Sequence, residues 1–148
     1  MIYFDTSALI KIFVLEKGTE YAQRLAEDHF PPATAAIAYA EIYSGFNRRK
    51  REGYVSANQY TKLSQQFEEH WATYTRIELI GEVLALAKVL LERHPLRAMD
   101  AIHLASAMSL QKGIQEPLRF AAADSRLLDA ASVEHLSPLN IENVKVKK

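Results

Sequence analysis

The sequence predicts an α/β protein built on a parallel sheet of four to five strands. Two short apolar runs, residues 2–4 and 118–123, each pass directly into an aspartate, a hydroxyl residue and then a helical segment. A buried strand that leads through a capping residue into a helix is typical of parallel α/β units. Amphipathic helical segments separate the predicted strands, which agrees with parallel pairing because a parallel connection has to cross the sheet.

Strands and helices are predicted to alternate along the chain. The strands lie at residues 2–4, 33–37, 74–79 and 118–123, with a last edge strand within 133–139. The helices lie at residues 8–13, 18–29, 40–51, 56–71, 80–93, 96–108 and 126–131. The helices at 80–93 and 96–108 are separated by His94 and Pro95, so they form a helical hairpin inserted into the α/β pattern. We expect a single domain over residues 1–148 with a flexible tail at 140–148.

Composition narrows the functional class. The 148 residues contain no cysteine, so disulfides and thiolate metal sites are excluded and a reducing cytoplasm is the expected location. The first residues resemble neither a signal peptide nor a membrane span, and we expect no membrane association. The 18 basic and 18 acidic residues give a net charge of zero, so contact with nucleic acid would depend on a local basic surface.

The helix at 96–108 carries the most informative residue. Apolar side chains repeat at helical spacing between 98 and 108, but Asp100 interrupts them. Pro95 is expected in the first turn, which places Asp100 about one turn into the helix, and Lys112 with Gly113 is expected to end the helix. The small alanines allow close packing, so Asp100 is expected to be partly buried and to need a cation, a proton or a metal ion. An acid that only complements the helix dipole is the alternative.

Three further acids occupy similar positions. Asp5 and Asp124 follow apolar strands, and Glu41 falls in the first turn of a helix, as Asp100 does. Each has an ordinary structural interpretation as a helix cap or a first-turn acid. Because the carboxyl ends of parallel strands share one edge of the sheet, however, all four are expected to meet there. Four carboxylates in a half-buried cleft cannot all remain ionised without a countercharge.

The chemistry of such a cluster is that of a hard metal ion. The chain has no cysteine and no pair of histidines at ligand spacing, so the donor set is oxygen alone. Oxygen donors favour Mg²⁺ or Mn²⁺ over Zn²⁺. Ions of this kind bind phosphates and lower the pKa of a bound water. Hydrolysis of a phosphodiester bond is therefore the predicted reaction.

Residues 4–11, 40–45, 100–105 and 123–127 resemble, in order and spacing, the signature segments of PIN domains, and most closely those of the single-domain toxins of VapBC toxin–antitoxin pairs. The resemblance covers essentially the whole chain, and the segment Asp-Ala-Ile-His-Leu-Ala at 100–105 is quite specific. It implies a three-layer α/β/α fold, a homodimer, and a cognate antitoxin whose C-terminal segment lies across the active-site groove. It also implies a Mg²⁺- or Mn²⁺-dependent endoribonuclease assisted by Thr6 or Ser7, with a catalytic metal site formed by Asp5, Glu41, Asp100 and Asp124.

The chain departs from the family pattern at one position. Members often carry threonine two residues before the fourth acid, where this chain has Ala122. A missing hydroxyl near Asp124 weakens the case for a second metal ion. We therefore expect one ion held by Asp5 and Asp100, with Glu41 and Asp124 as further candidate ligands.

Candidate contacts with RNA are fewer. The chain has one dense basic run and a further arginine beside the fourth acid, and both have the charge to hold a phosphate backbone: Arg48, Arg49, Lys50 and Arg51, and Arg126. For the run, a solvated helix end with cations suited to the helix dipole is the alternative. His103, one turn after Asp100, is interpreted as a proton shuttle, as a residue that supports the metal ligands from behind, or as a packing residue.

Two other functions remain open from the sequence. The first is a nuclease with the same acids that acts on DNA or on flap structures. The second is a non-catalytic acidic groove that captures a basic partner peptide.

Overall fold

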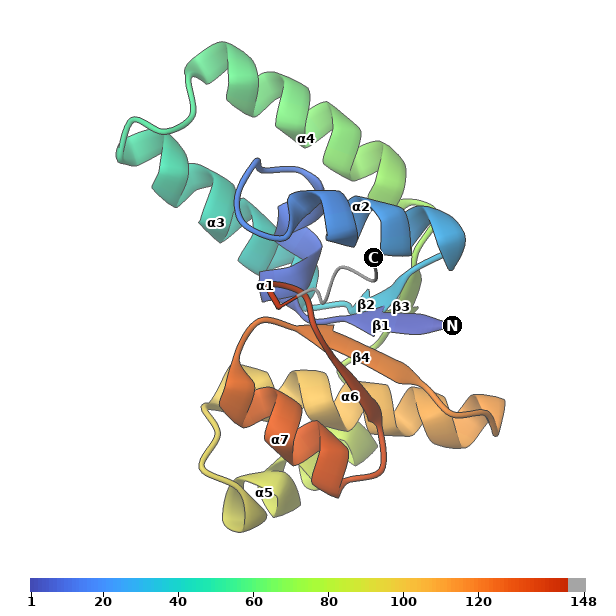
Figure 1. Ribbon diagram of the computed structural model, residues 1–148. Coiled ribbons are helices and arrows are strands. Elements are labelled where there is room, and N and C mark those ends of the chain that lie inside the picture. The colour runs from blue at the N-terminus through green and yellow to red at the C-terminus, as the bar shows by residue number, and fades with distance from the viewer. Residues whose placement is uncertain (144–148) are drawn as a thin grey trace.

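The computed structural model describes residues 1–143 and shows a twisted sheet covered on both faces by helices (Figure 1). The sheet has the strand order β3-β2-β1-β4-β5 and every pairing in it is parallel. The strands are β1 (Ile2–Phe4), β2 (Ala33–Ala35), β3 (Thr75–Ile77), β4 (Arg119–Ala122) and β5 (Ser137–Asn140). The predicted α/β architecture with a parallel sheet is confirmed.

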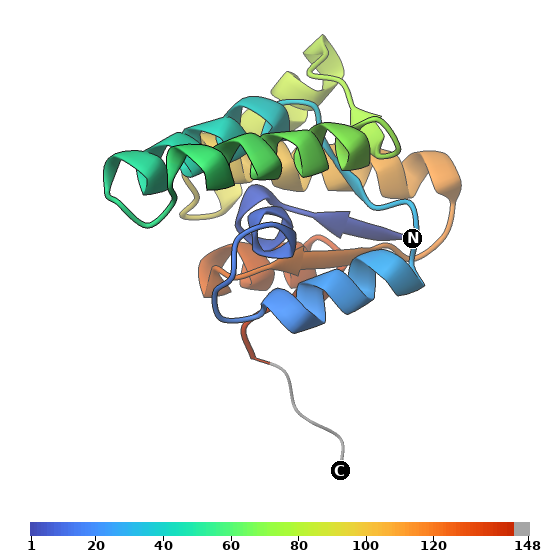
Figure 2. The ribbon, with the colours of Figure 1, turned by 90° about the horizontal axis from the view of Figure 1, so that it is seen from above.

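The helices divide into two layers, one on each face of the sheet (Figure 1), and Figure 2 looks onto one of these layers from above. One layer contains α1 (Thr6–Leu9), the 3-10 turn η1 (Ile10–Ile12), α2 (Thr19–Asp28), α3 (Ala38–Arg51) and α4 (Ala57–Trp71). The other contains α5 (Gly81–Arg93), α6 (Ala98–Ile114) and α7 (Ser125–Val133). The chain passes from β3 through α5 and α6 before it enters β4, so the predicted helical hairpin is present. None of the helices in residues 1–143 is long and apolar enough to cross a membrane.

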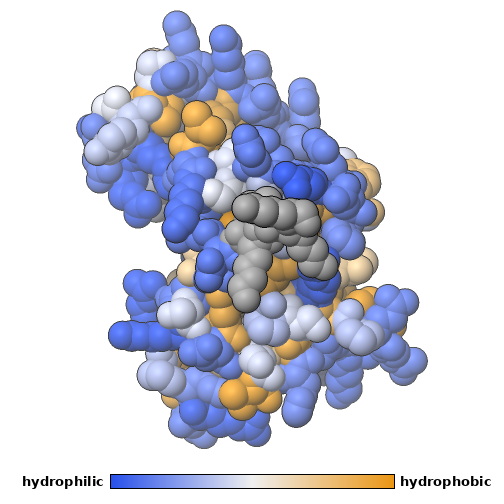
Figure 3. Space-filling view, viewed as in Figure 1, coloured by the Kyte–Doolittle hydropathy of each residue, from blue (hydrophilic) through white to orange (hydrophobic). Residues whose placement is uncertain are grey.

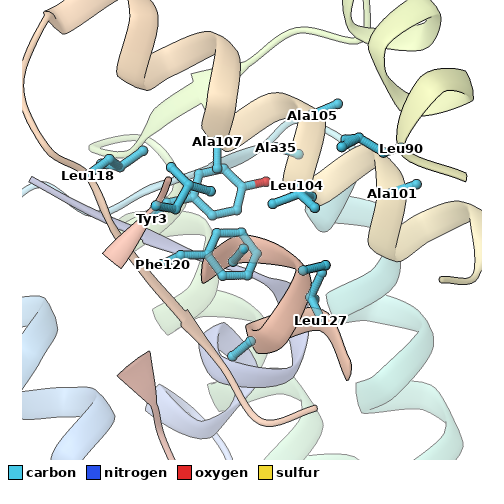
Figure 4. Packing of buried hydrophobic residues seen from close by; sticks show 14 of the residues in the cluster. Tyr3, Ala35, Leu90, Ala101, Leu104, Ala105, Ala107, Leu118, Phe120 and Leu127 are labelled. Carbon is cyan, nitrogen blue, oxygen red and sulfur yellow. The ribbon is translucent and has the colours of Figure 1, made fainter. Parts of the chain in front are cut away.

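The alternation of side chains along β1 builds two cores. Ile2 and Phe4 are buried against the layer of α1 to α4, whereas Tyr3 is buried against the layer of α5 to α7. The Tyr3 ring stacks on Phe120 of β4, with ring centroids 5.4 Å apart. Figure 4 shows these two rings beneath α6, with the hydroxyl of Tyr3 directed toward that helix.

The bounds of α6 differ from the prediction at both ends. Pro95 does not lie in the first turn: residues 94–97 form a separate turn in which Leu96 N donates to His94 O (2.9 Å), and extended Arg97 precedes the helix. The helix also continues through Gly113 to Ile114, and Gln115 adopts the left-handed conformation (φ 55°) that ends it. Asp100 still lies in the first turn, as predicted.

The C-terminal part of the fold also differs. Residue 133 belongs to α7, which ends where His135 takes a positive φ of 69° and turns the chain into β5. The first residues of the tail predicted to be flexible are ordered: Asn140 belongs to β5, and Ile141 is fully buried and donates its N–H to Ala122 O (3.0 Å). Burial of an apolar side chain explains this order. Residues 144–148 lie outside the described residues.

Candidate active site

Asp5 lies at the carboxyl end of β1 and caps α1. Its Oδ1 accepts hydrogen bonds from Ala8 N (2.9 Å) and from the Ser7 hydroxyl (2.7 Å), and the residue is only 4% exposed. Burial raises the pKa of Asp5 above its ordinary value, and the negative charge of Asp100 adds to this. The charge of His103 and the two hydrogen-bond donors oppose the rise without cancelling it.

Glu41 lies in the first turn of α3, and it lines the same groove as Asp5. Its Oε1 accepts the hydroxyl proton of Thr6 (2.7 Å) and lies 2.8 Å from His103 Nε2. Partial burial works to raise the pKa of Glu41, but the hydrogen bond and charge of His103, together with Thr6, outweigh it and hold this pKa below its ordinary value. Glu41 is therefore kept ionised while Asp5 resists ionisation.

Asp100, on α6, completes this group of acids. It shares with Asp5, Glu41 and His103 a groove of about 470 Å³, which we call the acidic groove. The cation beside Asp100 is Arg97, whose Nε lies 3.5 Å from Asp100 Oδ2 and whose side chain is 86% exposed. Such an exposed pair contributes little and leaves the carboxylate available to another cation.

Each of the two best-held acids is fixed through a single oxygen. Asp5 Oδ1 and Glu41 Oε1 each accept two donors, whereas Asp5 Oδ2 and Glu41 Oε2 accept no hydrogen bond from residues 1–143. This arrangement fits monodentate binding of a hard cation. Mg²⁺ keeps several of its waters and needs only one or two carboxylates from the protein, so it requires no complete protein cage. Among the described residues, no three acids or histidines form such a ready-made cage.

Asp124 is the least connected of the four predicted acids. It caps α7, with its Oδ1 accepting from Arg126 N (2.8 Å). It does not line the acidic groove but a smaller side pocket that it shares with Asp100, Arg97 and Arg126. Asp100 and Arg97 line both hollows and join them. The structure thus gathers Asp5, Glu41 and Asp100 closely and places Asp124 next to them across Asp100.

The two predicted assisting residues hold the acids in place. Thr6 donates to Glu41 and Ser7 donates to Asp5. The Ser7 hydroxyl also accepts from Ala123 N (3.2 Å) and so ties the end of β4 to the acid that follows β1. Ala122, the departure from the family pattern, is fully buried in the core against α7.

The basic run spreads around the end of α3. Arg48 and Arg49 line the acidic groove, and the exposed Lys50 lies over the ring of Tyr60, 4.9 Å from its centroid. Arg51 is exposed and lines none of the hollows described above. Since side chains seven residues apart share a helix face, the spacing of Arg48 from Glu41 could have identified Arg48 as one of the two cations of the run that line the groove.

A set of ion pairs forms a second part of the wall of the acidic groove, which we call the ion-pair rim. The buried Lys11 Nζ contacts Glu142 (2.8 Å) and Glu16 (3.1 Å), and Glu16 also pairs with Arg49 (3.1 Å). The sequence alone did not suggest these pairs, because Lys11 and Glu142 are 131 residues apart. The contact requires Gly18, since a Cβ there would lie 2.7 Å from Ile141 O.

An apolar groove of about 650 Å³ continues from this rim between the ends of α3 and α4. Glu16, Arg48 and Arg49 line both this groove and the acidic groove. Its apolar walls include Leu15 and Tyr54, which are 89% and 78% exposed. Figure 3 shows apolar surface gathered over the α3–α4 end of the molecule.

Comparison with known proteins identifies the family. The family model of the PIN domain matches residues 2–133. The chain belongs to the PIN-domain family. The predicted three-layer fold is confirmed by solved structures that superpose on nearly all of this PIN domain. A toxin-antitoxin complex from Klebsiella pneumoniae matches with a TM-score of 0.68 and 18% identity, over 97% of this chain and 100% of that one. PAE2754 from Pyrobaculum aerophilum matches with a TM-score of 0.63 and 14% identity, over 96% and 90%.

Curated relatives agree with this assignment. Ribonuclease VapC45 of Mycobacterium tuberculosis is 29% identical over 110 residues, which is 74% of this PIN domain and 76% of the relative. Ribonuclease VapC46 of the same species is 29% identical over 130 residues, 88% of this chain and 89% of the relative. The predicted resemblance to VapC-type PIN domains is thereby confirmed.

Proposed function

We propose that this PIN domain is a Mg²⁺- or Mn²⁺-dependent endoribonuclease and the toxin of a type II toxin–antitoxin pair. The observation that carries the proposal is the acidic groove, where Asp5, Glu41 and Asp100 meet at the carboxyl edge of the sheet and one oxygen each of Asp5 and Glu41 accepts no hydrogen bond from residues 1–143. The names of the curated relatives, which are ribonucleases, support the substrate. The structural neighbour from Klebsiella pneumoniae, which is a toxin-antitoxin complex, supports the biological role.

Different residues of this chain would bind the metal ion, orient the acids and contact the RNA. Asp5 and Asp100 would hold the metal ion, with Glu41 and Asp124 as further ligands from the two ends of the joined hollows. When bound, Mg²⁺ or Mn²⁺ polarises a phosphoryl oxygen and lowers the pKa of a coordinated water. Thr6 and Ser7 hold Glu41 and Asp5 in orientation. Arg48 and Arg126, which line the acidic groove and the side pocket, would neutralise neighbouring phosphates of the RNA.

The antitoxin is the second proposed partner. The apolar groove and the acidic groove share Glu16, Arg48 and Arg49, so one extended chain can occupy both. An amphipathic segment would bury its apolar side chains against Leu15 and Tyr54. A following basic side chain would then reach the free oxygens of Asp5 and Glu41. We propose that the cognate antitoxin inhibits the nuclease in this way.

Three broader expectations from the sequence stay proposals. They are a single domain over residues 1–148, a cytoplasmic location and a homodimer. Light scattering of the purified protein, alone and with its antitoxin, would measure the oligomeric state directly.

The proposal is tested by cleavage of a labelled, structured RNA with Mn²⁺ or Mg²⁺, compared with EDTA and with Asp100→Asn. We expect cleavage that requires both the metal and Asp100. The matched control is Asp129→Asn, which changes an exposed acid of α7 that lines none of the hollows described above and should cut at the wild-type rate. Cleavage of DNA but not of RNA would show that the protein is a deoxyribonuclease. Binding of an Arg-rich peptide without any metal-dependent cleavage would show that the groove is a docking site and that the protein is not a nuclease.

A further inference from the structure

A chain of buried polar groups connects the core to Glu41. The Tyr3 hydroxyl lies 2.8 Å from His103 Nδ1, and His103 Nε2 lies 2.8 Å from Glu41 Oε1. Tyr3 is fully buried and His103 is 2% exposed. The tyrosine ring is fixed between β4 and α6 (Figure 4), so the chain begins at a rigid point of the fold.

Counting donors and acceptors fixes the proton on one histidine nitrogen. Glu41 is an ionised acceptor, and the single hydroxyl proton of Thr6 is donated to Glu41 Oε1. His103 Nε2, which is 3.0 Å from Thr6 Oγ1 and 2.8 Å from Glu41 Oε1, must therefore be the donor. On the other side of the ring, His103 Nδ1 lies 2.8 Å from the Tyr3 hydroxyl, so hydrogen bonds at both nitrogens fix the orientation of the imidazole.

We propose that Tyr3 and His103 are positioning residues for the acid Glu41. Tyr3 fixes the orientation of the imidazole through Nδ1, and His103 together with Thr6 holds Glu41 Oε1 so that Oε2 faces the groove. The proposal rests on the proposed nuclease function, because the orientation of Glu41 matters only if Glu41 serves the reaction. It also selects, among the roles that the sequence left open for His103 (a proton shuttle, a support for the metal ligands, a packing residue), the support of a metal ligand.

A packing role alone does not explain these contacts. Tyr3 belongs to a core cluster whose other fully buried members are alanine, leucine and phenylalanine, so phenylalanine would pack there as well and the hydroxyl is explained by its polar contact with His103. The polar atoms of Tyr3 and His103 instead form a line that ends on a carboxylate at the groove. Groups that orient metal ligands in this way affect metal affinity or activity by about 10- to 100-fold when removed.

The decisive variant is Tyr3→Phe, which removes one oxygen atom and keeps the ring stack. Its matched control is Tyr74→Phe, because the Tyr74 hydroxyl is buried without a hydrogen-bond partner among the described residues. We expect Tyr3→Phe to lower kcat about 10-fold with KM within about 2-fold of wild type, and to weaken Mn²⁺ binding measured without RNA. Tyr74→Phe should change neither. Equal kcat and Mn²⁺ affinity for wild type and Tyr3→Phe would overturn the proposal.

A second pair of variants tests the donor itself. His103→Gln offers an amide N–H near the position of Nε2, whereas His103→Leu does not. We expect about 100-fold loss of kcat in His103→Leu and partial recovery in His103→Gln. Two variants of equal activity would contradict positioning through this hydrogen bond. If His103→Leu does not fold, the kcat and the Mn²⁺ affinity of Tyr3→Phe decide whether the proposal is correct.

Nuclear magnetic resonance of the histidine nitrogens separates this proposal from the proposed function. We expect the Nε2 proton signal of His103 to shift in Glu41→Gln and in Tyr3→Phe, but not in Tyr74→Phe. If wild type cuts no RNA, the nuclease function fails, and the Mn²⁺ affinities then decide whether Tyr3 still orients Glu41. If wild type cuts RNA but the Nε2 proton signal of His103 is unchanged in Glu41→Gln, the positioning role is wrong and the nuclease function is retained.

Discussion

The two sides of the acidic groove use charge in opposite ways. On one side Asp5 and Glu41 are held by hydroxyl, amide and imidazole donors, and no lysine or arginine pairs with either within residues 1–143. On the ion-pair rim, Lys11 and Arg49 are paired with Glu16 and Glu142. The acids thus keep an oxygen for an external cation, whereas the rim cations are neutralised within the fold.

This difference separates binding from stability. A carboxylate held only by hydrogen-bond donors keeps its negative charge for a metal ion, at some cost to the stability of the metal-free protein. The charge of the buried Lys11 is compensated by the two carboxylates that it contacts. These contacts also hold residues 141–142 against the loop that contains Gly18. We therefore expect variants of the rim to change stability and variants of the acids to change activity.

The largest stability effect is expected for Lys11→Met. This change keeps most of the volume but leaves Glu16 and Glu142 without their shared cation. Breaking a buried ion pair costs about 3–5 kcal/mol of stability. Because both acids are partly exposed, we expect Lys11→Met to lose about 3 kcal/mol. For a chain of this size that loss lowers Tm by roughly 10 °C, measurable by calorimetry.

The control for this prediction is Lys88→Met. Lys88 pairs with Glu92 on the exposed surface of α5, with its side chain 80% exposed, so its loss should cost no more than about 0.5 kcal/mol. A similar Tm for both variants would show that burial does not strengthen the rim. Nuclease activity lost from Lys11→Met below its Tm would show that the two sides of the groove are not independent.

The acids should give the next largest effect, and it should depend on metal. Mn²⁺ at about 100 times its Kd stabilises a protein that binds it by about 2.7 kcal/mol, because it binds only the native state. We expect Mn²⁺ to raise the Tm of wild type through this stabilisation, and we expect it to leave the Tm of Asp5→Asn unchanged. Without metal, Asp5→Asn should be more stable than wild type by about 1 kcal/mol, since a buried charge is removed. An unchanged response to Mn²⁺ in Asp5→Asn would remove Asp5 from the metal site.

Much of the acidic groove could be predicted from sequence because its determinants are local. Asp5 and Asp124 follow apolar strands, and Glu41 and Asp100 lie in first helical turns, which are positions that periodicity and capping rules define. The parallel sheet then brings their elements to one edge. The misplaced end of α6 and the misplaced start of β5 arose where a non-glycine residue, Gln115 or His135, adopts a positive φ. Local propensity does not foresee these conformations.

The ion-pair rim could not be predicted in this way. Lys11 looked like an ordinary helix residue, and Glu142 lay in a tail expected to be flexible. Their contact depends on β5 completing the sheet and on Ile141 finding a buried position. The partner of His103 was likewise hidden, because Tyr3 lies in a run interpreted only as apolar. Long-range partners of polar residues need the tertiary structure.

A smaller effect is expected from pH acting on the rim. Burial works to raise the pKa of Glu16, but Lys11 and Arg49 outweigh it and hold that pKa below the ordinary 4.5. The stability from Glu16 is therefore fully present above about pH 4.5 and is lost as pH falls through the lower pKa of the folded state. We expect Glu16→Gln to be less stable than wild type by about 1 kcal/mol at pH 7, with the difference closing below pH 4.5. A difference that persists unchanged at pH 3 would contradict this electrostatic origin.

The smallest effect concerns Arg48, the cation of the run that lines the acidic groove without pairing with the rim. Arg48 lines both grooves and forms no ion pair with residues 1–143, whereas Arg49 is paired with Glu16. Arg48→Gln should therefore raise KM for RNA a few-fold with kcat unchanged, and reduce the slope of log affinity against log salt by about one.

The matched control is Lys50→Gln, which removes the same charge from the neighbouring turn but from a side chain that lies over Tyr60 and outside both grooves. If both variants lower the salt slope equally, the run binds RNA through its net charge. If only Arg48→Gln does, a phosphate lies over the face of α3 that also presents Glu41, and the direction of the RNA across the groove is set by that one contact.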